Sequence, residues 1–470
     1  MELAPLLYDL AYLVAAVLFI FGLKFLSSPR TAPLGNSLGA FGMFLAVIVT
    51  LLKMNAETGI IGWPVILAGV ALGGLIGGVM AKRVEMTGMP ELVGLFNGFG
   101  GGASALVALS EGLRARGAFV DPDPANIGDI VFPIAVGTSS LIGWVTLTGS
   151  LIAVFKLNGV FRKNVFLPGQ NGIKALLFLG CLAMIGGLVS TPGSVALMVG
   201  LAVAACVLGV LFVIPIGGAD MPVVVSFLNS LSGLAAAATG FVVSNNALII
   251  GGSLVGAAGL ILTGIMCKAM NRRFLDVVFK AYGGGAAEAS GEKRTVQGYE
   301  AEEAALVFDG ARSVIIVPGY GMAVSQAQHV VQEFATVLEE RGVDVKFAIH
   351  PVAGRMPGHM NVLLAEASVP YDKLFDLDEI NSEFSDCDVA LVVGANDTVN
   401  PAAKTDPGGP LGGMPILDVE KARTVLIVKR SLSPGYAGVD NDLFYRPSTM
   451  MLFGDGKKML TELLSAVKEL

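Results

Sequence analysis

A stretch of 93 residues, from Ala175 to Cys267, contains one charged side chain, that of Asp220. Soluble domains carry about 25% charged residues, so a folded surface made from this stretch would be insoluble in water. A bilayer is the solvent in which such a segment is stable, since its hydrocarbon core matches apolar side chains. The stretch therefore predicts membrane-spanning helices and argues against an ordinary cytosolic enzyme.

The remaining charge is distributed unevenly along the 470 residues. Of the 69 Asp, Glu, Lys and Arg residues, 26 lie in residues 1–280 and 43 in residues 281–470. We therefore expect a transmembrane domain over residues 1–270, a linker over residues 271–312 and a polar domain over residues 313–470. The net charge of −7 gives no basic footprint for nucleic acid. The four cysteines form no close pair, so neither a disulfide framework nor a metal site is indicated.

The first 270 residues contain apolar segments that are long enough to cross a bilayer, which takes about 20 residues per helix. Glu2 stands where a signal peptide would be basic, so the first segment is expected to be retained. The predicted spans are Leu6–Leu26, Leu34–Leu52, Ile60–Ala81, Pro90–Leu109, Pro133–Phe155, Ile173–Ser190, Val195–Ile216, Pro222–Val243 and Ala247–Cys267.

Lys and Arg in the connecting loops predict the orientation of these spans. With the N-terminus outside, the inside loops hold 12 Lys and Arg residues and the outside loops hold 3. Basic residues concentrate on the cytoplasmic side of membrane proteins. We therefore expect an outside N-terminus and a C-terminal domain in the cytoplasm.

Glycines recur at helical spacing within the spans. Gly73-Gly74-Leu75-Ile76-Gly77-Gly78 and the pair Gly252 and Gly256 are small-xxx-small patterns, which let helix backbones approach closely. They predict close packing, either within one bundle or against another subunit or a homodimer mate.

Polar side chains are scarce in this half, so each deserves a hypothesis. Asp220 precedes Met221-Pro222 and could cap the eighth span. Asn229 and Asn97 lie inside spans, where interhelical hydrogen bonds and a water-lined polar path are both open interpretations. The three histidines are all in the polar half, so a proton relay through this half alone would lack a group that titrates near neutrality.

The polar half shows the alternation that is typical of an α/β parallel sheet. Short buried strands are predicted at Ser313–Pro318, Val343–Ile349, Val389–Val393 and Thr424–Val428, with a helix at Val324–Arg341. The overall fold class is therefore a multi-pass α-helical membrane domain followed by a Rossmann-like α/β domain.

A glycine fingerprint follows the first predicted strand. Residues Gly319 to Val324 read G-x-G-x-x-V, in which two glycines allow a tight turn and a close approach to a pyrophosphate. A glycine turn without a ligand is the alternative. The strand and helix on either side favour dinucleotide binding.

The residues at the strand ends favour NADP over NAD. An NAD site carries an acid near the end of the second strand, but that strand ends at Ile349, His350 and Pro351. Lys429-Arg430-Ser431 follows the strand Thr424–Val428 and could bind a 2′-phosphate, unless it is only a solvated strand end. No second substrate domain and no nucleophile–base pair follow, so we expect the hydride partner on another polypeptide.

The sequence resembles the beta subunit of proton-translocating nicotinamide nucleotide transhydrogenase over nearly its whole length. The most specific stretches are GGADMPVVVSFLNSLSG (Gly217–Gly233), IMCKAMNR (Ile265–Arg272), VPGYGMAVSQAQH (Val317–His329), VAGRMPGHMNVLLAEA (Val352–Ala367), VGANDTVNPAA (Val393–Ala403) and KRSLSPGYAGVDN (Lys429–Asn441).

The resemblance implies a function and partners. Hydride would pass from NADH on a partner to NADP⁺ on this subunit, driven by protons moving inward. An alpha-type subunit would hold NAD(H), a small membrane subunit would add further helices, and the protomers would form a dimer. The location implied is the bacterial inner membrane.

The resemblance also implies site residues. Asp397 matches an acid that helps to couple the proton and hydride steps, and Asp220 and Asn229 match polar groups of the proton path. The NADP-contacting positions are Gly319, Tyr320, Gly321, Met322, Ala323, Val324, Val352, Ala353, Gly354, Arg355, Met356, Pro357, Gly394, Ala395, Asn396, Asp397, Thr398, Gly413, Met414, Lys429, Arg430, Ser431, Gly435, Tyr436, Asp455 and Gly456.

One position departs from the family pattern. Asn97 stands in the fourth span where well-known relatives have histidine, and an amide cannot titrate. We expect a histidine on a partner subunit to complete the relay. Two other classes stay open from the sequence: a membrane channel or transporter with a cytosolic NADP-sensing domain, and a purely structural membrane subunit, which the glycine loop disfavours.

Overall fold

A computed structural model describes residues 3–26, 31–58, 62–115, 127–161, 165, 167–217, 220–279, 296–356, 358–435 and 437–470. The chain divides into two compact units. One comprises Met1–Ile216 and Val224–Leu262, and the other comprises Gly217–Val223 and Thr263–Leu470.

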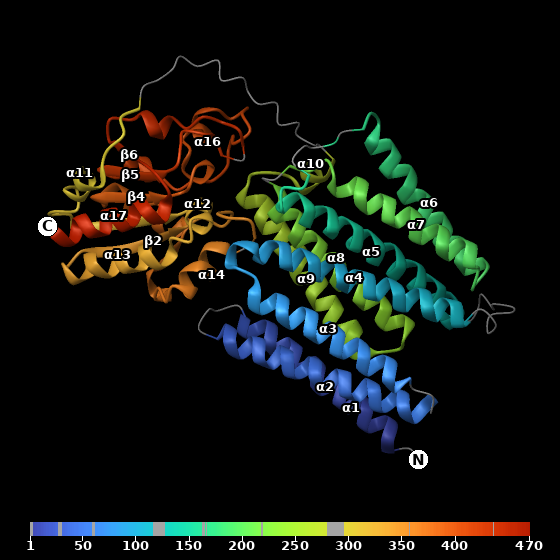
Figure 1. The fold of residues 1–470 in the computed structure, drawn as a ribbon. Helices are drawn as coiled ribbons and strands as arrows, with labels where there is room; N and C mark the ends of the chain where they lie inside the picture. The colour runs from blue at the N-terminus through green and yellow to red at the C-terminus, as the bar shows by residue number, and fades with distance from the viewer. Residues whose placement is uncertain are drawn as a thin grey trace. The chain divides into compact units, whose positions relative to one another are not determined.

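The described part of the first 270 residues contains nine helices that are long and apolar enough to cross a membrane, shown from blue to yellow-green in Figure 1. This confirms the predicted spans, with ends that differ by a few residues. The helices are α1 (Leu3–Leu26), α2 (Ala32–Thr58), α3 (Trp63–Arg83), α4 (Met89–Arg114), α5 (Ile127–Leu157), α6 (Gln170–Ser190), α7 (Val195–Val213), α8 (Met221–Val242) and α9 (Asn246–Ala269).

The largest differences from the prediction are at the end of α2, where the helix continues to Thr58, and at the start of α5. The sequence predicted a span that begins at Pro133, whereas Pro133 lies inside a helix that begins at Ile127. Proline lacks an N–H group and usually marks a first turn. Membrane helices tolerate it in their interior because neighbouring groups satisfy the freed carbonyl.

Glycines set how closely some of the helices approach. A Cβ added at Gly252 of α9 would lie 2.5 Å from the Ala237 nitrogen of α8, and one at Gly233 of α8 would lie 2.6 Å from the Gly256 nitrogen of α9. Backbone therefore meets backbone at this crossing, as the Gly252–Gly256 pattern predicted.

The glycines of α3 behave differently. No residue of α3 is buried. A Cβ at Gly73, Gly74, Gly77 or Gly78 would have no atom of the chain within 4 Å. Within the part of the chain that the structure describes, this face therefore has no packing partner, and the small-residue pattern there is not explained by packing inside one bundle.

The C-terminal unit contains a parallel sheet of six strands in the order β3-β2-β1-β4-β5-β6. Every pairing is parallel, with Ile315 opposite both Lys346 of β2 and Ala390 of β4. Two of the strands, β3 and β6, were not predicted. The strands are β1 (Ser313–Pro318), β2 (Asp344–Ile349), β3 (Leu374–Asp376), β4 (Val389–Val393), β5 (Thr424–Lys429) and β6 (Thr449–Phe453).

Both faces of the sheet are covered, which is why β4 is apolar at every position and β1 at every position after Ser313. Helices α13 (Gln328–Glu340) and α17 (Gly456–Glu469) lie side by side on one face (Figure 1). On the other face Ile315 and Val317 join a buried cluster with Ile380 and Phe384. The other helices are α10 (Phe274–Phe279), α11 (Ala301–Ala305), α12 (Tyr320–Val324), α14 (His359–Glu366), α15 (Leu377–Ile380) and α16 (Ala402–Thr405).

Parts of the expected linker 271–312 form helices. Helix α10 lies near its start and α11 near its end, and residues 280–295 between them fall outside the described residues.

The α8–α9 crossing generates a prediction. We expect Gly252→Ala to destabilise the purified chain by about 1–3 kcal/mol, since the added methyl group overpacks a backbone contact. Gly77→Ala on α3 is the matched control and should be neutral or slightly stabilising, because alanine is the better helix former. Thermal unfolding in detergent measures both. Equal melting temperatures for the two variants would contradict the packing described above.

Candidate functional site

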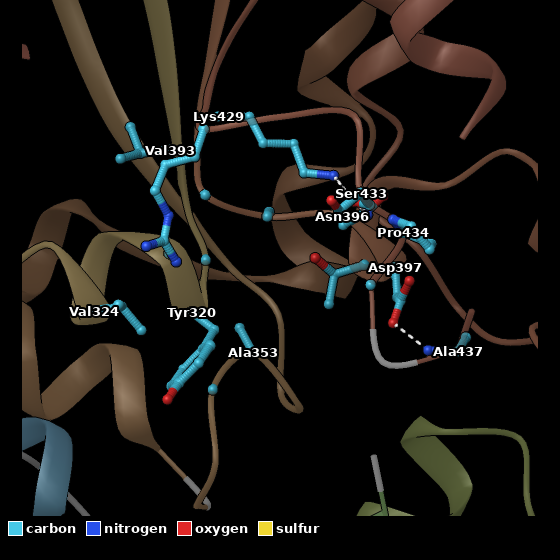
Figure 2. Close-up of a pocket in the computed structure, with 18 of the residues that line it drawn as sticks. Tyr320, Val324, Ala353, Val393, Asn396, Asp397, Lys429, Ser433, Pro434 and Ala437 are labelled. Atoms are coloured by element: carbon cyan, nitrogen blue, oxygen red, sulfur yellow. Dashed lines mark hydrogen bonds between the residues drawn. The ribbon is translucent and has the colours of Figure 1, made fainter. Parts of the chain in front are cut away.

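A cavity of about 460 Å³ opens at the carboxyl ends of the strands in the C-terminal unit. The strand order reverses between β1 and β4, and such switch points are where open α/β sheets bind ligands. Loops that follow β1, β2, β4, β5 and β6 supply most of the wall. Figure 2 shows side chains from the loops after β1, β2, β4 and β5.

The glycine turn after β1 lies directly against the turn after β4. The Gly319 N–H donates to the Val393 carbonyl and the Gly321 N–H to the Gly394 carbonyl, both at 2.9 Å. A Cβ at Gly319 would lie 2.4 Å from the Ala395 Cα atom, and one at Gly321 would lie 2.6 Å from the Gly394 Cα atom. Glycine is therefore required at both positions of the fingerprint by the fold itself.

The helix after the fingerprint differs from the prediction of one helix over Val324–Arg341. Helix α12 ends at Val324 and α13 begins at Gln328. Gln326 between them has a φ of +50°, a left-handed conformation that interrupts a right-handed helix. In the first turn of α12 the Gly321 and Met322 N–H groups already bond to the Gly394 and Gly319 carbonyls.

Asp397 ties the turn after β4 to the loop after β5. Its Oδ2 atom accepts a hydrogen bond from the Ala437 N–H at 3.0 Å (Figure 2). A Cβ at Gly435 would lie 2.3 Å from the Asp397 Oδ1 atom, so the carboxylate packs on a bare backbone. Asn441, which is fully buried, donates to the Asn396 carbonyl at 3.2 Å and joins the same two loops.

Lys429 places a cation at the end of β5. Its ammonium donates to the Ser433 carbonyl at 2.5 Å (Figure 2). It also lies 4.6 Å from the centre of the Phe444 ring. Burial lowers the pKa of Lys429 to about 8, and the carboxylates of Asp397 and Asp440 oppose that shift. An incoming phosphate would meet a desolvated ammonium, beside the exposed side chain of Arg430.

The end of β2 carries a neutral ring instead of an acid. The buried His350 ring shares a hydrogen bond of 2.8 Å with the Pro415 carbonyl through Nε2, and its Nδ1 accepts from the Val352 N–H at 3.2 Å. Burial lowers the pKa of His350 to about 4, although the bond to Pro415 acts in the opposite direction. At neutral pH the His350 ring therefore carries no charge.

Most of the predicted nucleotide-contacting residues line the cavity. Of the others, Met322 and Ala323 are buried. Three more do not line the cavity: Arg355, Met356 and Gly413. Pro357 and Tyr436 lie outside the described residues. The predicted residues in the wall are Gly319, Tyr320, Gly321, Val324, Val352, Ala353, Gly354, Gly394, Ala395, Asn396, Asp397, Thr398, Met414, Lys429, Arg430, Ser431, Gly435, Asp455 and Gly456.

Several wall residues were missed by sequence reasoning. Pro410 and Leu411 lie in the glycine-rich run Gly408 to Gly413, which was a usable signal. Met270 and Arg272, from the segment after α9 in the same compact unit, carried no signal of their own. Arg272 also donates through Nη1 to both carboxylate oxygens of Asp220, at 2.8 and 2.9 Å. Asp220 therefore forms an ion pair with a residue of the cavity wall.

The predicted polar residues of the membrane unit are partly brought together. The buried Asn97 amide donates to the Val225 carbonyl at 3.4 Å, one helical turn from the half-buried Asn229 on α8. A second polar group was missed: the hydroxyls of Ser139 and Thr239 lie 2.6 Å apart, where one donates to the other, and both oxygens lie within 3.4 Å of the Ser104 carbonyl oxygen. Isolated hydroxyls in apolar helices gave no pattern from which to predict it.

Comparison with known proteins places this geometry in a family. Residues 8–466 match the family model described as NAD(P) transhydrogenase beta subunit. Two relatives are named NAD(P) transhydrogenase subunit beta, one from Rhodospirillum rubrum and one from a designated strain of that species. Each is 50% identical, over 97% of this chain and 98% of the relative.

The neutral His350 generates a prediction about acid stability. Its folded pKa of about 4 lies below the usual value near 6.5, so folding favours the neutral ring. This stabilisation is complete above pH 6.5 and is lost as the pH falls through 4. We expect the unfolding free energy to be about 2 kcal/mol lower at pH 5 than at pH 8 from this group alone.

Thermal unfolding of the purified chain at the two pH values measures the effect, with His350→Gln as the comparison. The variant removes the titrating ring, so its stability should change less between pH 5 and pH 8. An identical pH dependence for both proteins would contradict the prediction.

Proposed function

The chain belongs to the NAD(P) transhydrogenase beta-subunit family, and we propose that its cavity binds NADP(H) for hydride exchange with NAD(H) on a partner subunit. The observation that carries the proposal is the charge pattern at the strand ends. Lys429 and Arg430 stand at the end of β5, where a 2′-phosphate could pair with them. The end of β2 has the neutral His350 in place of an acid for a ribose hydroxyl.

The residues present fit this nucleotide. The turn from Gly319 to Gly321 brings backbone without bulky side chains into the cavity wall, which suits the close approach of a pyrophosphate. NADP supplies the hydride chemistry when bound, so the protein needs no acid or base at the reacting carbon. The chain contributes binding, orientation and exclusion of water. Asp397 holds the loop after β5 against the cavity.

We propose that proton movement is coupled to nucleotide binding through Asp220 and Arg272. The ion pair between them and the place of Arg272 in the cavity wall support this route. Protonation of Asp220 would weaken its hold on Arg272 and change the wall of the cavity. One charge crossing 100 mV is worth about 2.3 kcal/mol, or about 50-fold in an equilibrium constant, which is enough to drive such a change.

The proton path within the membrane unit is proposed to pass Asn97 and Asn229. Neither amide titrates, so they would hydrogen-bond water, and a histidine on a partner subunit would supply the titrating group. The partners proposed are an alpha-type NAD(H)-binding subunit and a small membrane subunit, in a dimer of protomers. The bacterial inner membrane, with the N-terminus outside and the nucleotide domain in the cytoplasm, remains the proposed setting.

A reconstitution experiment tests the proposed function. The purified chain is mixed with NADPH, an NAD analogue and a separately purified NAD(H)-binding alpha-type partner, and reduction of the analogue is followed by absorbance. We expect hydride transfer only when both proteins are present. Solute flux through vesicles that responds to NADPH, without hydride transfer under any condition, would instead support a channel with a nucleotide-sensing domain.

Lys429 gives a pH-dependent prediction. Its ammonium loses its proton above pH 8 in the free protein, so NADPH affinity should fall by up to about tenfold per pH unit above that value. Lys429→Arg should abolish the fall, because arginine stays charged. Calorimetric titration from pH 7 to pH 10 measures it, with NADH as the ligand that lacks the 2′-phosphate. If NADPH affinity falls equally with pH in the wild type and in Lys429→Arg, this role of Lys429 is excluded.

Asp397 gives a prediction about coupling. In Asp397→Asn the amide oxygen can still accept from the Ala437 N–H, so NADPH binding should change by less than about fivefold. The loss of charge should abolish the acceleration of NADPH release by a proton gradient in vesicles that hold the assembled enzyme. A variant with full coupling and normal release would refute the proposed role.

A further inference from the structure

The loop between β2 and α14 forms one wall of the cavity. Val352, Ala353 and Gly354 line it. Two histidines stand at its ends, His350 after β2 and His359 at the first position of α14. Each uses its Nδ1 atom to accept a backbone N–H of the loop: His350 from Val352 at 3.2 Å, and His359 from Arg355 at 3.0 Å.

The His359 ring also packs on the loop. Its side chain is buried, with 1% of the residue exposed. Gly354 has a φ of +107°, and a Cβ there would lie 2.4 Å from the His359 Nδ1 atom. Glycine at 354 therefore makes room for the ring, and the ring in turn fills the space beside a backbone that no other residue could adopt without strain.

The bond from Arg355 to His359 has a consequence inside the cavity. The Arg355 guanidinium carbon lies 4.5 Å from the centre of the Tyr320 ring, and Tyr320 belongs to the cavity wall. The His359 ring lies 6.4 Å from the same tyrosine ring. Fixing the Arg355 backbone thus fixes a guanidinium stacked on Tyr320, next to the glycine turn after β1.

We propose that His359 is a positioning residue for the nucleotide site: by accepting the Arg355 N–H through Nδ1, it holds the Val352–Gly354 wall and Arg355 in place to slow the release of NADP(H). The inference rests on the proposed binding of NADP(H) in this cavity. His359 lies outside the cavity wall, so it acts through the loop and not by contact with the nucleotide.

Two substitutions separate the hydrogen bond from the bulk of the ring. Asparagine ends in polar atoms near the place of Nδ1, so His359→Asn retains an acceptor for the Arg355 N–H. Glutamine is one carbon longer and carries its amide near the place of Nε2, so His359→Gln loses that acceptor while keeping a polar side chain. His329→Asn makes the same replacement of histidine by asparagine at an exposed position of α13, and it is the control for that replacement.

The experiment measures NADPH dissociation by stopped-flow fluorescence and NADPH affinity by titration, on the purified full-length chain. We expect His359→Gln to release NADPH at least about fivefold faster, as the loss of one hydrogen bond predicts. His359→Asn and His329→Asn should stay within about twofold of the wild type. Thermal unfolding is recorded for all the proteins, and the Asn and Gln variants should melt within a few degrees of each other.

Three results would overturn the inference. Equal release rates for His359→Asn and His359→Gln would show that the Nδ1 acceptor does not matter. If NADPH release from the His359 variants becomes faster in proportion to the fall in their melting temperatures, His359 has a general structural role instead. Failure of the wild-type chain to bind NADPH would overturn the proposed function, and this inference with it, whereas the first two results leave NADP(H) binding intact.

Discussion

The contact between two backbone turns, one after β1 and one after β4, is the constraint on which the site depends. Gly319 and Gly321 lie so close to Gly394 and Ala395 that a single methyl group would not fit. Two hydrogen bonds across the contact pair groups that would otherwise be buried without partners. The contact fixes where the strand order reverses, and the cavity opens beside it. Loops from the neighbouring strands then reach the same space.

The membrane unit depends on a different constraint. Backbone groups in hydrocarbon must be paired internally, so the apolar part of the chain forms helices. The side chains then decide how closely the helices pack, as at the α8–α9 crossing. Asp220 is the one charged side chain in the longest apolar stretch, and its partner Arg272 belongs to the wall of the cavity in the C-terminal unit. This ion pair is the contact through which the proposed protonation of Asp220 would reach the cavity wall.

The sequence predicted the features that depend on local pattern. Long apolar runs located the spans, and short apolar runs located four of the strands. β3 was missed because Leu374–Asp376 is a three-residue strand at the sheet edge, with a burial pattern that has no alternation. The break at Gln326 was missed because a positive φ at glutamine has no local signature.

The candidate site was predicted in outline and missed in its supporting contacts. Glycine turns and the Lys429-Arg430 pair are visible in the chain. The proposed roles of His359 and Arg272 are not visible, because each depends on a contact that the fold creates. Arg272 pairs with Asp220, which is 52 residues away in the sequence, and His359 packs on a loop whose course the sequence does not show. All the nucleotide-contacting positions remain predictions, including Pro357 and Tyr436, which lie outside the described residues.

The most direct test of the account is to locate bound NADPH by determining the structure of the chain with the nucleotide present. The account predicts the pyrophosphate over Gly319 to Gly321 and the 2′-phosphate beside Lys429 and Arg430. Nucleotide bound elsewhere on the chain, or bound in this cavity with its 2′-phosphate away from both cations, would contradict it.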